Sequence, residues 1–298
     1  MDRRKPLLLN DWEIAADGAL AEAAQRCGVR LLAKVRLSSA LNLDRSGLSD
    51  ELFAYGTRAE LDFVIAEGDS ALAQFAVEYD GPQHLRDPRT MRRDRMKSEI
   101  CARLGLPLVR IGSEYLQRER RFTLIGYLVE VWSLERAFTA AQARGAIPYD
   151  EPFIPQMIIA DATTGVADWP YWLERPARLR MVQAQRAGKL ISPTPEQLTT
   201  PYPPHGEPDT AELVEAFAVL ATKPAGFIIG HAVLRNHPVF IPGLSPRMLA
   251  SDVAVADAGR RLERWLTGDE TVIADRQALA ELRDRTADWI SQGGTVPA

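Results

Sequence analysis

Two acidic residues stand two positions apart at the end of an apolar run, "FAVEYDG". Alternate side chains of a strand share a face, so Glu78 and Asp80 are expected to point to the same side. Burying an unpaired carboxylate in a core strand is unfavourable, so something must compensate the two charges. A divalent cation can do this, because Mg²⁺ takes carboxylate, water and phosphate oxygens as ligands. The pair therefore predicts chemistry that uses a bound metal ion.

A third acid, Asp62, interrupts the preceding apolar run "ELDFVI". The two runs are separated by a short turn and predict a β-hairpin, which would set Asp62 beside the other two acids. We expect Asp62, Glu78 and Asp80 to converge at one end of a sheet and to hold Mg²⁺, with Mn²⁺ as a substitute. The structural alternative is that Glu78 and Asp80 pair with Arg110 or with arginines of the following helix.

Positive charge follows the acids. Between Arg86 and Arg121 there are eleven Lys or Arg against five acids, a local charge of +6 in a chain whose formal net charge is -4. Such a segment beside an acid cluster predicts a polyanionic partner, although a solvated helix face has the same composition. The residues expected to contact a nucleic-acid backbone are Arg86, Arg89, Arg92, Arg93, Arg95 and Arg110.

The elements that must position these residues can be predicted from periodicity and chain breakers. Helices are expected at about 11–27, 89–104 and 121–143, and strands at "ELDFVI", "LAQFAVEYDG" and "LPLVRIG". The run "LLAKVRLSSAL" is expected to be a strand that leads into a short turn or helix. This order predicts an α/β domain over residues 1–145, with a mixed sheet flanked by helices.

The second half of the chain is less regular. Residues 146–208 are expected to be a linker and a proline-rich segment, since six prolines fall between 193 and 208. Residues 209–298 are expected to form a mostly helical accessory region, with helical patterns at 209–222 and 247–291 and a strand-like "GFIIGHAVL" between them. This region is expected to help bind the substrate or a protein partner.

Taken together, "LDFVI", "VEYDGPQH" and "RRDRMKSEICARLGLPLVRI" resemble the PD-(D/E)XK nuclease superfamily. The group related to very-short-patch repair endonucleases, with its uncharacterised bacterial relatives, is the closest in pattern. The resemblance covers about residues 10–118. It implies a restriction-endonuclease-like fold and an Mg²⁺-dependent endonuclease.

The resemblance also implies roles for individual residues. Asp62 would be the metal-binding acid and Glu78 the second acid. Asp80 stands where the superfamily has lysine, so the lysine's role must be supplied from elsewhere. Lys97, three residues after Asp94 on the following helix, is one candidate. His84 is the other candidate, as a base or as the group that orients the attacking water.

A helical glutamate is a further feature of the family. Glu13 on the first predicted helix could match it, but Glu22 lies on the same helix and the spacing does not choose between them.

The function expected from these parts is metal-dependent hydrolysis of phosphodiester bonds in nucleic acid, with DNA as the expected substrate. The alternative is a catalytically inactive protein of the same fold that binds nucleic acid or another protein. The absence of lysine at position 80 favours this alternative, and the intact acids argue against it. A glycoside hydrolase is excluded on geometry, because Glu78 and Asp80 would flank the scissile bond from one side.

Composition sets the remaining expectations. No run of about 18 apolar residues is present, so no membrane span is expected. The three leucines near the N-terminus are too few for the apolar region of a signal peptide. Cys27 and Cys101 are too few for a disulfide framework. These features predict a cytoplasmic protein.

Overall fold

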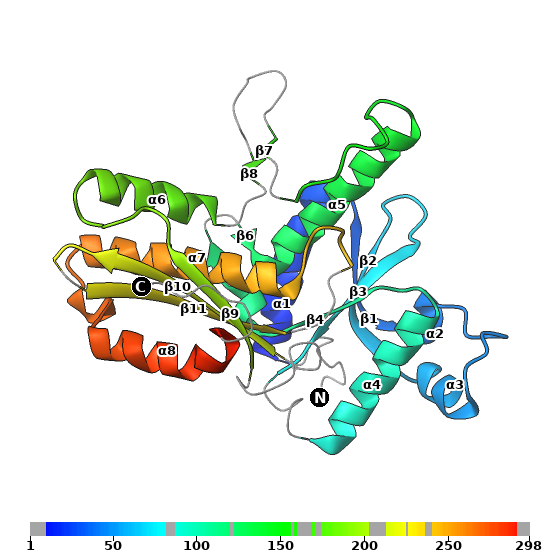
Figure 1. Ribbon diagram of the computed structural model, residues 1–298. Helices are drawn as coiled ribbons and strands as arrows, with labels where there is room; N and C mark the ends of the chain where they lie inside the picture. The colour runs from blue at the N-terminus through cyan, green and yellow to red at the C-terminus, as the bar shows by residue number, and fades with distance from the viewer. Residues whose placement is uncertain are drawn as a thin grey trace, which may run out of the picture. The chain divides into compact units, whose positions relative to one another are not determined.

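The computed structural model describes residues 10–81, 87–119, 122–155, 158–159, 169–170, 174–202, 213–224, 226–235 and 240–290. The chain divides into two compact units, Met1–Glu151 and Pro152–Ala298 (Figure 1). Both units combine helices with a four-stranded sheet, so the protein is of mixed α/β class, as predicted. None of the helices in these ranges has the length and apolarity that crossing a membrane requires.

The first unit has the following elements in chain order: α1 (Asp11–Cys27), β1 (Arg30–Arg36), α2 (Leu37–Ala40), α3 (Asp50–Gly56), β2 (Glu60–Ala66), β3 (Ala73–Tyr79), α4 (Pro88–Arg103), β4 (Leu108–Ile111), a 3₁₀ turn (Ser113–Leu116), β5 (Arg118–Glu119), β6 (Phe122–Thr123) and α5 (Leu124–Ala143). The helices and strands expected in this part of the chain are confirmed, with ends that shift by a few residues.

The main sheet of this unit has the order β1-β2-β3-β4. The first two pairings are antiparallel and β3 pairs with β4 in parallel, so α4 is the crossover between the parallel strands. Apolar side chains alternate between the two faces of the sheet. Phe75 packs edge-on against Trp132 of α5, whereas Ala76 belongs to the core that includes Ile100 and Cys101 of α4. The sheet is thus covered by helices on both faces.

Local sequence explains why α1 and α4 begin where they do. Asn10 caps α1 by accepting a hydrogen bond from the backbone of Glu13, at 2.9 Å. Asp87 caps α4, with its carboxylate accepting from the backbone N–H of Arg89 and of Thr90, and Pro88 occupies the first turn. The two helices that carry predicted site residues therefore have fixed starting points.

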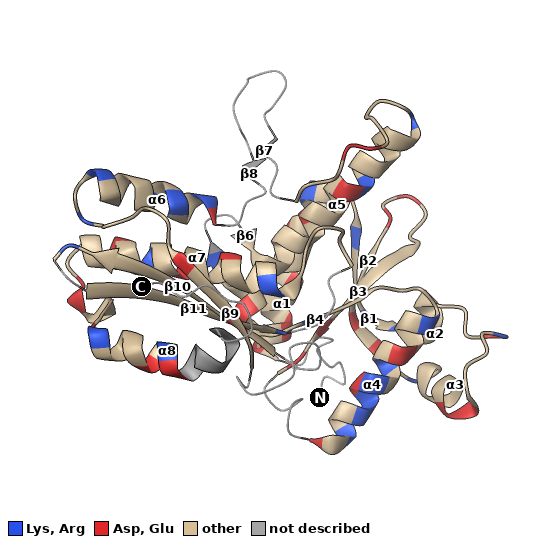
Figure 2. Cartoon of the chain, in the orientation of Figure 1, with Lys and Arg blue, Asp and Glu red and all other residues tan. Residues whose placement is uncertain are grey.

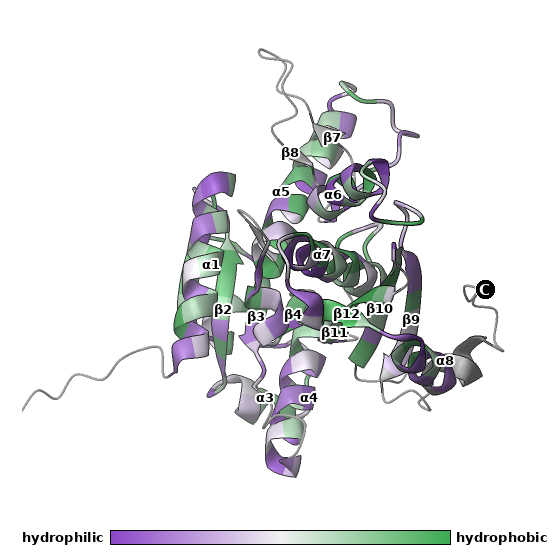
Figure 3. Ribbon diagram, turned by 90° about the vertical axis from the view of Figure 1, so that its left-hand side faces the viewer, coloured by the Kyte–Doolittle hydropathy of each residue, from purple (hydrophilic) through white to green (hydrophobic). Residues whose placement is uncertain are grey.

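The second unit contains β7 (Ile158–Ile159), β8 (Trp169–Pro170), α6 (Arg175–Arg186), β9 (Glu196–Tyr202), β10 (Leu213–Thr222), β11 (Gly226–Arg235), α7 (Pro246–Leu266), a 3₁₀ turn (Glu270–Val272), β12 (Ile273–Ala274) and α8 (Arg276–Ile290). Its sheet has the order β12-β11-β10-β9, with antiparallel pairing throughout. Strands β2 and β10 stand out as apolar in Figure 3.

The helical pattern expected at 209–222 is wrong, because Leu213–Thr222 forms β10. Part of the expected linker and proline-rich segment forms regular elements, since Arg175–Arg186 is α6 and Glu196–Tyr202 is β9. Helix α7 packs closely on this sheet. A Cβ at Gly230 of β11 would lie 2.1 Å from the backbone oxygen of Ala254, so glycine is required there.

Candidate functional site

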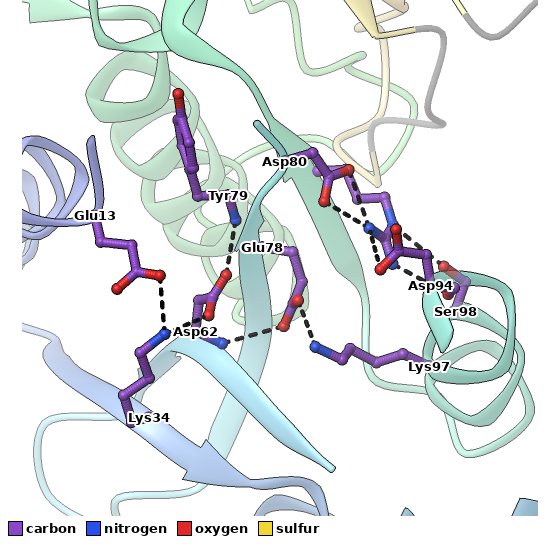
Figure 4. A network of polar contacts seen from close by, with 10 residues as sticks. Glu13, Lys34, Asp62, Glu78, Tyr79, Asp80, Asp94, Lys97 and Ser98 are labelled. Atoms are coloured by element: carbon purple, nitrogen blue, oxygen red, sulfur yellow. Dashed lines mark hydrogen bonds and ion pairs between the residues drawn. The ribbon is translucent and has the colours of Figure 1, made fainter. Parts of the chain in front are cut away.

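The predicted acids lie at one end of the first sheet, where β2 and β3 separate. Regular pairing reaches Phe63 and Val77. Beyond that point side-chain carboxylates accept the hydrogen bonds of the backbone N–H groups. Glu78 Oε1 accepts from the Asp62 backbone N–H at 3.1 Å, and Asp62 Oδ2 accepts from the Tyr79 N–H at 3.0 Å (Figure 4). Each carboxylate thus accepts a hydrogen bond from the backbone of the other's strand, which holds Asp62 and Glu78 side by side.

Lys97 of α4 joins this pair. Its Nζ lies 2.5 Å from Glu78 Oε2, and both side chains are nearly buried. Burial raises the pKa of Glu78 to about 7, the Lys97 charge opposes that shift, and the nearby Asp62 adds to it. The sequence identified Lys97 as a candidate for the missing lysine, and the structure brings its ammonium group against the second acid.

Lys34 of β1 is a second lysine in the site, which sequence analysis missed. Its Nζ lies 2.7 Å from Asp62 Oδ1 and 3.2 Å from Glu13 Oε1. Burial alone would lower the pKa of Lys34, but the Asp62 and Glu13 carboxylates raise it. The same contacts favour Glu13 over Glu22 as the helical acid of the site, because Glu22 pairs with Arg26 and Arg118.

The backbone of Lys34 is unusual. Its φ of 52° lies in the left-handed region, which non-glycine residues rarely adopt within a strand. The neighbouring residues Ala33 and Val35 keep the regular register with β2. Strained residues of this kind cluster at functional sites. The local sequence "LLAKVRL" carries no glycine or asparagine that would have signalled this conformation.

Asp80 occupies a different environment from the other two acids. Its Oδ1 and Oδ2 lie 2.8 Å and 3.0 Å from Nη1 of Arg110 on β4. Arg110 also donates to the backbone oxygen of Asp94 at 3.0 Å and lies 3.3 Å from its carboxylate. Burial alone would lower the pKa of Arg110, but Asp80 and Asp94 raise it. This is the structural alternative that the sequence had left open.

The two carboxylate environments change the expected roles of Asp80 and Arg110. Asp80 is 5% exposed and Arg110 is 6% exposed, so their charges are turned inward and compensate each other. In this arrangement Arg110 supports the end of β3 rather than offering its guanidinium to a nucleic-acid backbone. In the part of the chain that the structure describes, no group of three or more His, Cys, Asp or Glu side chains is arranged to hold a metal ion.

A cleft of about 580 Å³ opens over Asp62, Glu78 and Lys97. Its walls come from α1, α3, α4 and the ends of β2 and β3. The lining residues are Asn10, Trp12, Glu13, Tyr55, Asp62, Glu78, Tyr79, Gly81, Thr90, Arg93, Asp94 and Lys97. Burial and the charges of Glu78 and Asp94 raise the pKa of Tyr55 to about 12. The cleft thus combines acids, one buried lysine, one arginine and aromatic rings.

The basic residues predicted on the following helix lie along α4 (Figure 2). Arg89, Arg92, Arg93 and Arg95 are exposed there. Arg92 forms an ion pair with Glu51 of α3, and Arg93 lines the cleft. His84 and Arg86, which the sequence also proposed, lie outside the described residues.

Comparison with known protein families gives a match in the first unit. Residues 5–124 match the model of a family described as a protein of unknown function, DUF2726. This span is less than half of the chain and contains every predicted site residue. No curated protein and no solved structure matches the chain.

Proposed function

We propose that the first unit is a metal-dependent endonuclease of restriction-endonuclease-like architecture, which hydrolyses phosphodiester bonds in nucleic acid, with DNA as the expected substrate. The observation that carries the proposal is the meeting of Asp62, Glu78 and Lys97 in one cleft. The order of elements supports it as well, since the acids lie on an antiparallel hairpin and the lysine lies on the helix that crosses to a parallel strand.

The donor set fits Mg²⁺ by type. Mg²⁺ is commonly held by one or two carboxylates, with water and substrate phosphate completing its shell. Asp62 and Glu78 are the two carboxylates that would hold it, so a cluster of three protein ligands is not required. When bound, the metal ion supplies Lewis acidity and an activated water.

The protein's own residues would orient the reacting groups and neutralise negative charge. Lys97, fixed by its contact with Glu78, can hold a water or a phosphoryl oxygen by hydrogen bonds and can offset negative charge that develops during hydrolysis. Lys34 of β1 holds Asp62, and Glu13 of α1 holds Lys34 in turn. The exposed arginines of α4 supply positive charge beside the cleft for a polyanionic backbone.

One observation favours the second candidate, an inactive protein of the same fold that binds nucleic acid or another protein. Asp80 stands where the resemblance expects lysine, and it is engaged in a buried salt bridge. The nuclease proposal requires that the ammonium group of Lys97 takes the role of the lysine absent at position 80. An activity assay tests this.

The test is cleavage of plasmid DNA, single-stranded DNA and RNA by the purified protein with Mg²⁺, with Mn²⁺ and with chelator. Asp62→Ala and Glu78→Ala are compared with the unchanged protein. The proposal expects metal-dependent cutting that both substitutions abolish. Absence of cutting under every condition, with no metal binding by calorimetry and with nucleic-acid affinity unchanged in both variants, would support the inactive binding protein instead.

A further inference from the structure

The cleft has an aromatic side that the hydrolytic proposal leaves unused. Trp12 lines it and is 50% exposed, which is high for so large an apolar side chain. Its ring stacks on Tyr79, with ring centroids 6.2 Å apart and planes inclined by 9°. Tyr79 is 8% exposed, so it backs the tryptophan ring from the protein side. The result is a supported aromatic surface along one wall of the cleft.

The position of Trp12 is fixed relative to the acids. It lies in the first turn of α1, whose start is held by the Asn10 cap. The next residue, Glu13, lies 3.2 Å from Lys34 Nζ, which in turn lies 2.7 Å from Asp62. A tryptophan side chain has few rotatable bonds, so a ring anchored in this way loses little conformational entropy when a ligand stacks on it.

The cleft beside this ring has room for a nucleobase. A volume of about 580 Å³ is in the range of small-molecule pockets and has room for a nucleotide or two. In a duplex the faces of the bases are covered by their neighbours. In a single strand every base can present a face for aromatic stacking. An unpaired nucleobase therefore fits both the dimensions of the cleft and the aromatic side.

We propose that Trp12 is a stacking platform for an unpaired nucleobase beside the phosphodiester held at Asp62, Glu78 and Lys97, so that the preferred substrate is single-stranded nucleic acid. This inference rests on the proposed nuclease function for its phosphodiester. Arg93 lines the same cleft from α4 and places a positive charge where the backbone of such a strand would pass. The stacking itself requires neither a metal ion nor cleavage.

Binding measured by fluorescence anisotropy in chelator tests the inference. The labelled probes are a deoxythymidine oligomer, an abasic oligomer of equal length, a duplex and a uridine ribo-oligomer. Trp12→Ala is expected to weaken binding of the deoxythymidine and uridine oligomers by about 5- to 150-fold, the range for loss of one stacked base. Binding of the abasic oligomer and of the duplex should not change, because neither offers a free base face.

Two further variants control the experiment. Trp12→Phe keeps an aromatic face and is expected to retain most of the affinity for single strands. Tyr149→Ala removes another aromatic ring of the same unit, one that is 92% exposed and outside the cleft, and should bind as the unchanged protein does. Circular dichroism melting confirms that each variant is folded. Unchanged single-strand binding by Trp12→Ala, or an equal loss on the abasic oligomer, would overturn the inference.

The two proposals fail separately. Trp12-dependent binding of single strands without cleavage under any metal condition would refute the nuclease and leave the stacking platform in place. Metal-dependent cleavage with no effect of Trp12 on single-strand binding or cutting would refute the platform and leave the nuclease in place.

Discussion

The ammonium group of Lys97 lies 2.5 Å from the Glu78 carboxylate, although the two residues are 19 positions apart in the chain. The contact joins the helix between the parallel strands to the hairpin that carries the acids. It places a positive charge in the cleft of a chain that has aspartate at the position where the resemblance expects lysine.

Replacement of Lys97 by methionine is expected to lower the rate of metal-dependent cleavage by about 100- to 1000-fold, because a positioned donor for the reacting phosphate is lost. Lys97→Arg should keep part of the activity, since it keeps the charge. Arg103→Met on the same helix is the matched control, because Arg103 pairs with Glu99 on the surface. Initial rates at saturating substrate provide the measurement. Equal rates for Lys97→Met and the control would show that Lys97 has no role in the reaction.

The salt bridge between Asp80 and Arg110 is expected to stabilise the folded protein. Arg110→Met leaves Asp80 buried without its guanidinium partner, so the free energy of unfolding should fall by about 3–5 kcal/mol. The double variant Asp80→Asn/Arg110→Met should lose less than the sum of the two single losses, because the interaction is lost only once. Urea denaturation of all four proteins gives the comparison. Additive losses would mean that the two side chains do not stabilise each other.

Removal of Lys34 is expected to strengthen metal binding. Its positive charge lies against Asp62, one of the two carboxylates that would hold the cation. Lys34→Met should therefore lower the Kd for Mn²⁺ by about fivefold, corresponding to about 1 kcal/mol, with Asp62→Asn as the variant that abolishes binding. Titration calorimetry of the folded variants measures this. Weaker Mn²⁺ binding by Lys34→Met would show that the lysine supports the cation site rather than competing with it.

Asp252 of α7 is expected to make the free energy of unfolding of the second unit depend on pH. Burial, and then the charge of Glu174, raise the pKa of Asp252 to about 8, while Arg178 opposes the shift. Between about pH 4 and pH 8 the folded protein therefore keeps a proton that the unfolded chain releases, and the free energy of unfolding falls as the pH rises.

Asp252→Asn removes this titration. The variant should gain stability relative to the unchanged protein as the pH rises from 5 to 8, by at most about 1.4 kcal/mol per pH unit. Urea denaturation of both proteins at the two pH values measures the difference. The same stability difference at both pH values would contradict the raised pKa of Asp252.

The first sheet and its helices could be predicted because each element has its own local signal. The hairpin strands are short apolar runs on either side of a turn, α4 begins with a proline directly after a capping aspartate, and Gly105 and Pro107 separate it from β4. The juxtaposition of Asp62 and Glu78 follows from the same signals, since a short turn between two strands fixes which residues face each other.

The second sheet could not be predicted in this way. The run "LVEAFAVLAT" in β10 is almost continuously apolar and rich in alanine and leucine, which also suits a buried helix. Such a strand is apolar on both faces because helices cover both. Leu220 is buried on one face, and Phe217 packs with Leu279 of α8 on the other. Without alternation, periodicity does not separate the two structures.

The pairing of charged side chains that are far apart in the chain could not be predicted from the sequence either. Glu78 and Asp80 look equivalent in "VEYDG", yet one meets Lys97 and the other meets Arg110. Which acid is paired depends on how α4 and β4 are packed against β3, and neither strand alternation nor helix spacing specifies that packing. The left-handed backbone of Lys34 has no local signal either, because its neighbours are ordinary strand formers.

The proposed nuclease activity depends on Asp62 and Glu78 as the acidic centre of the site. The most direct measurement is the rate of Mg²⁺-dependent cleavage by Asp62→Asn beside Asp69→Asn, which changes an exposed aspartate in the turn of the same hairpin. We predict that Asp62→Asn abolishes cleavage while Asp69→Asn cuts at the rate of the unchanged protein. Equal cleavage by the two folded variants would contradict this role of Asp62.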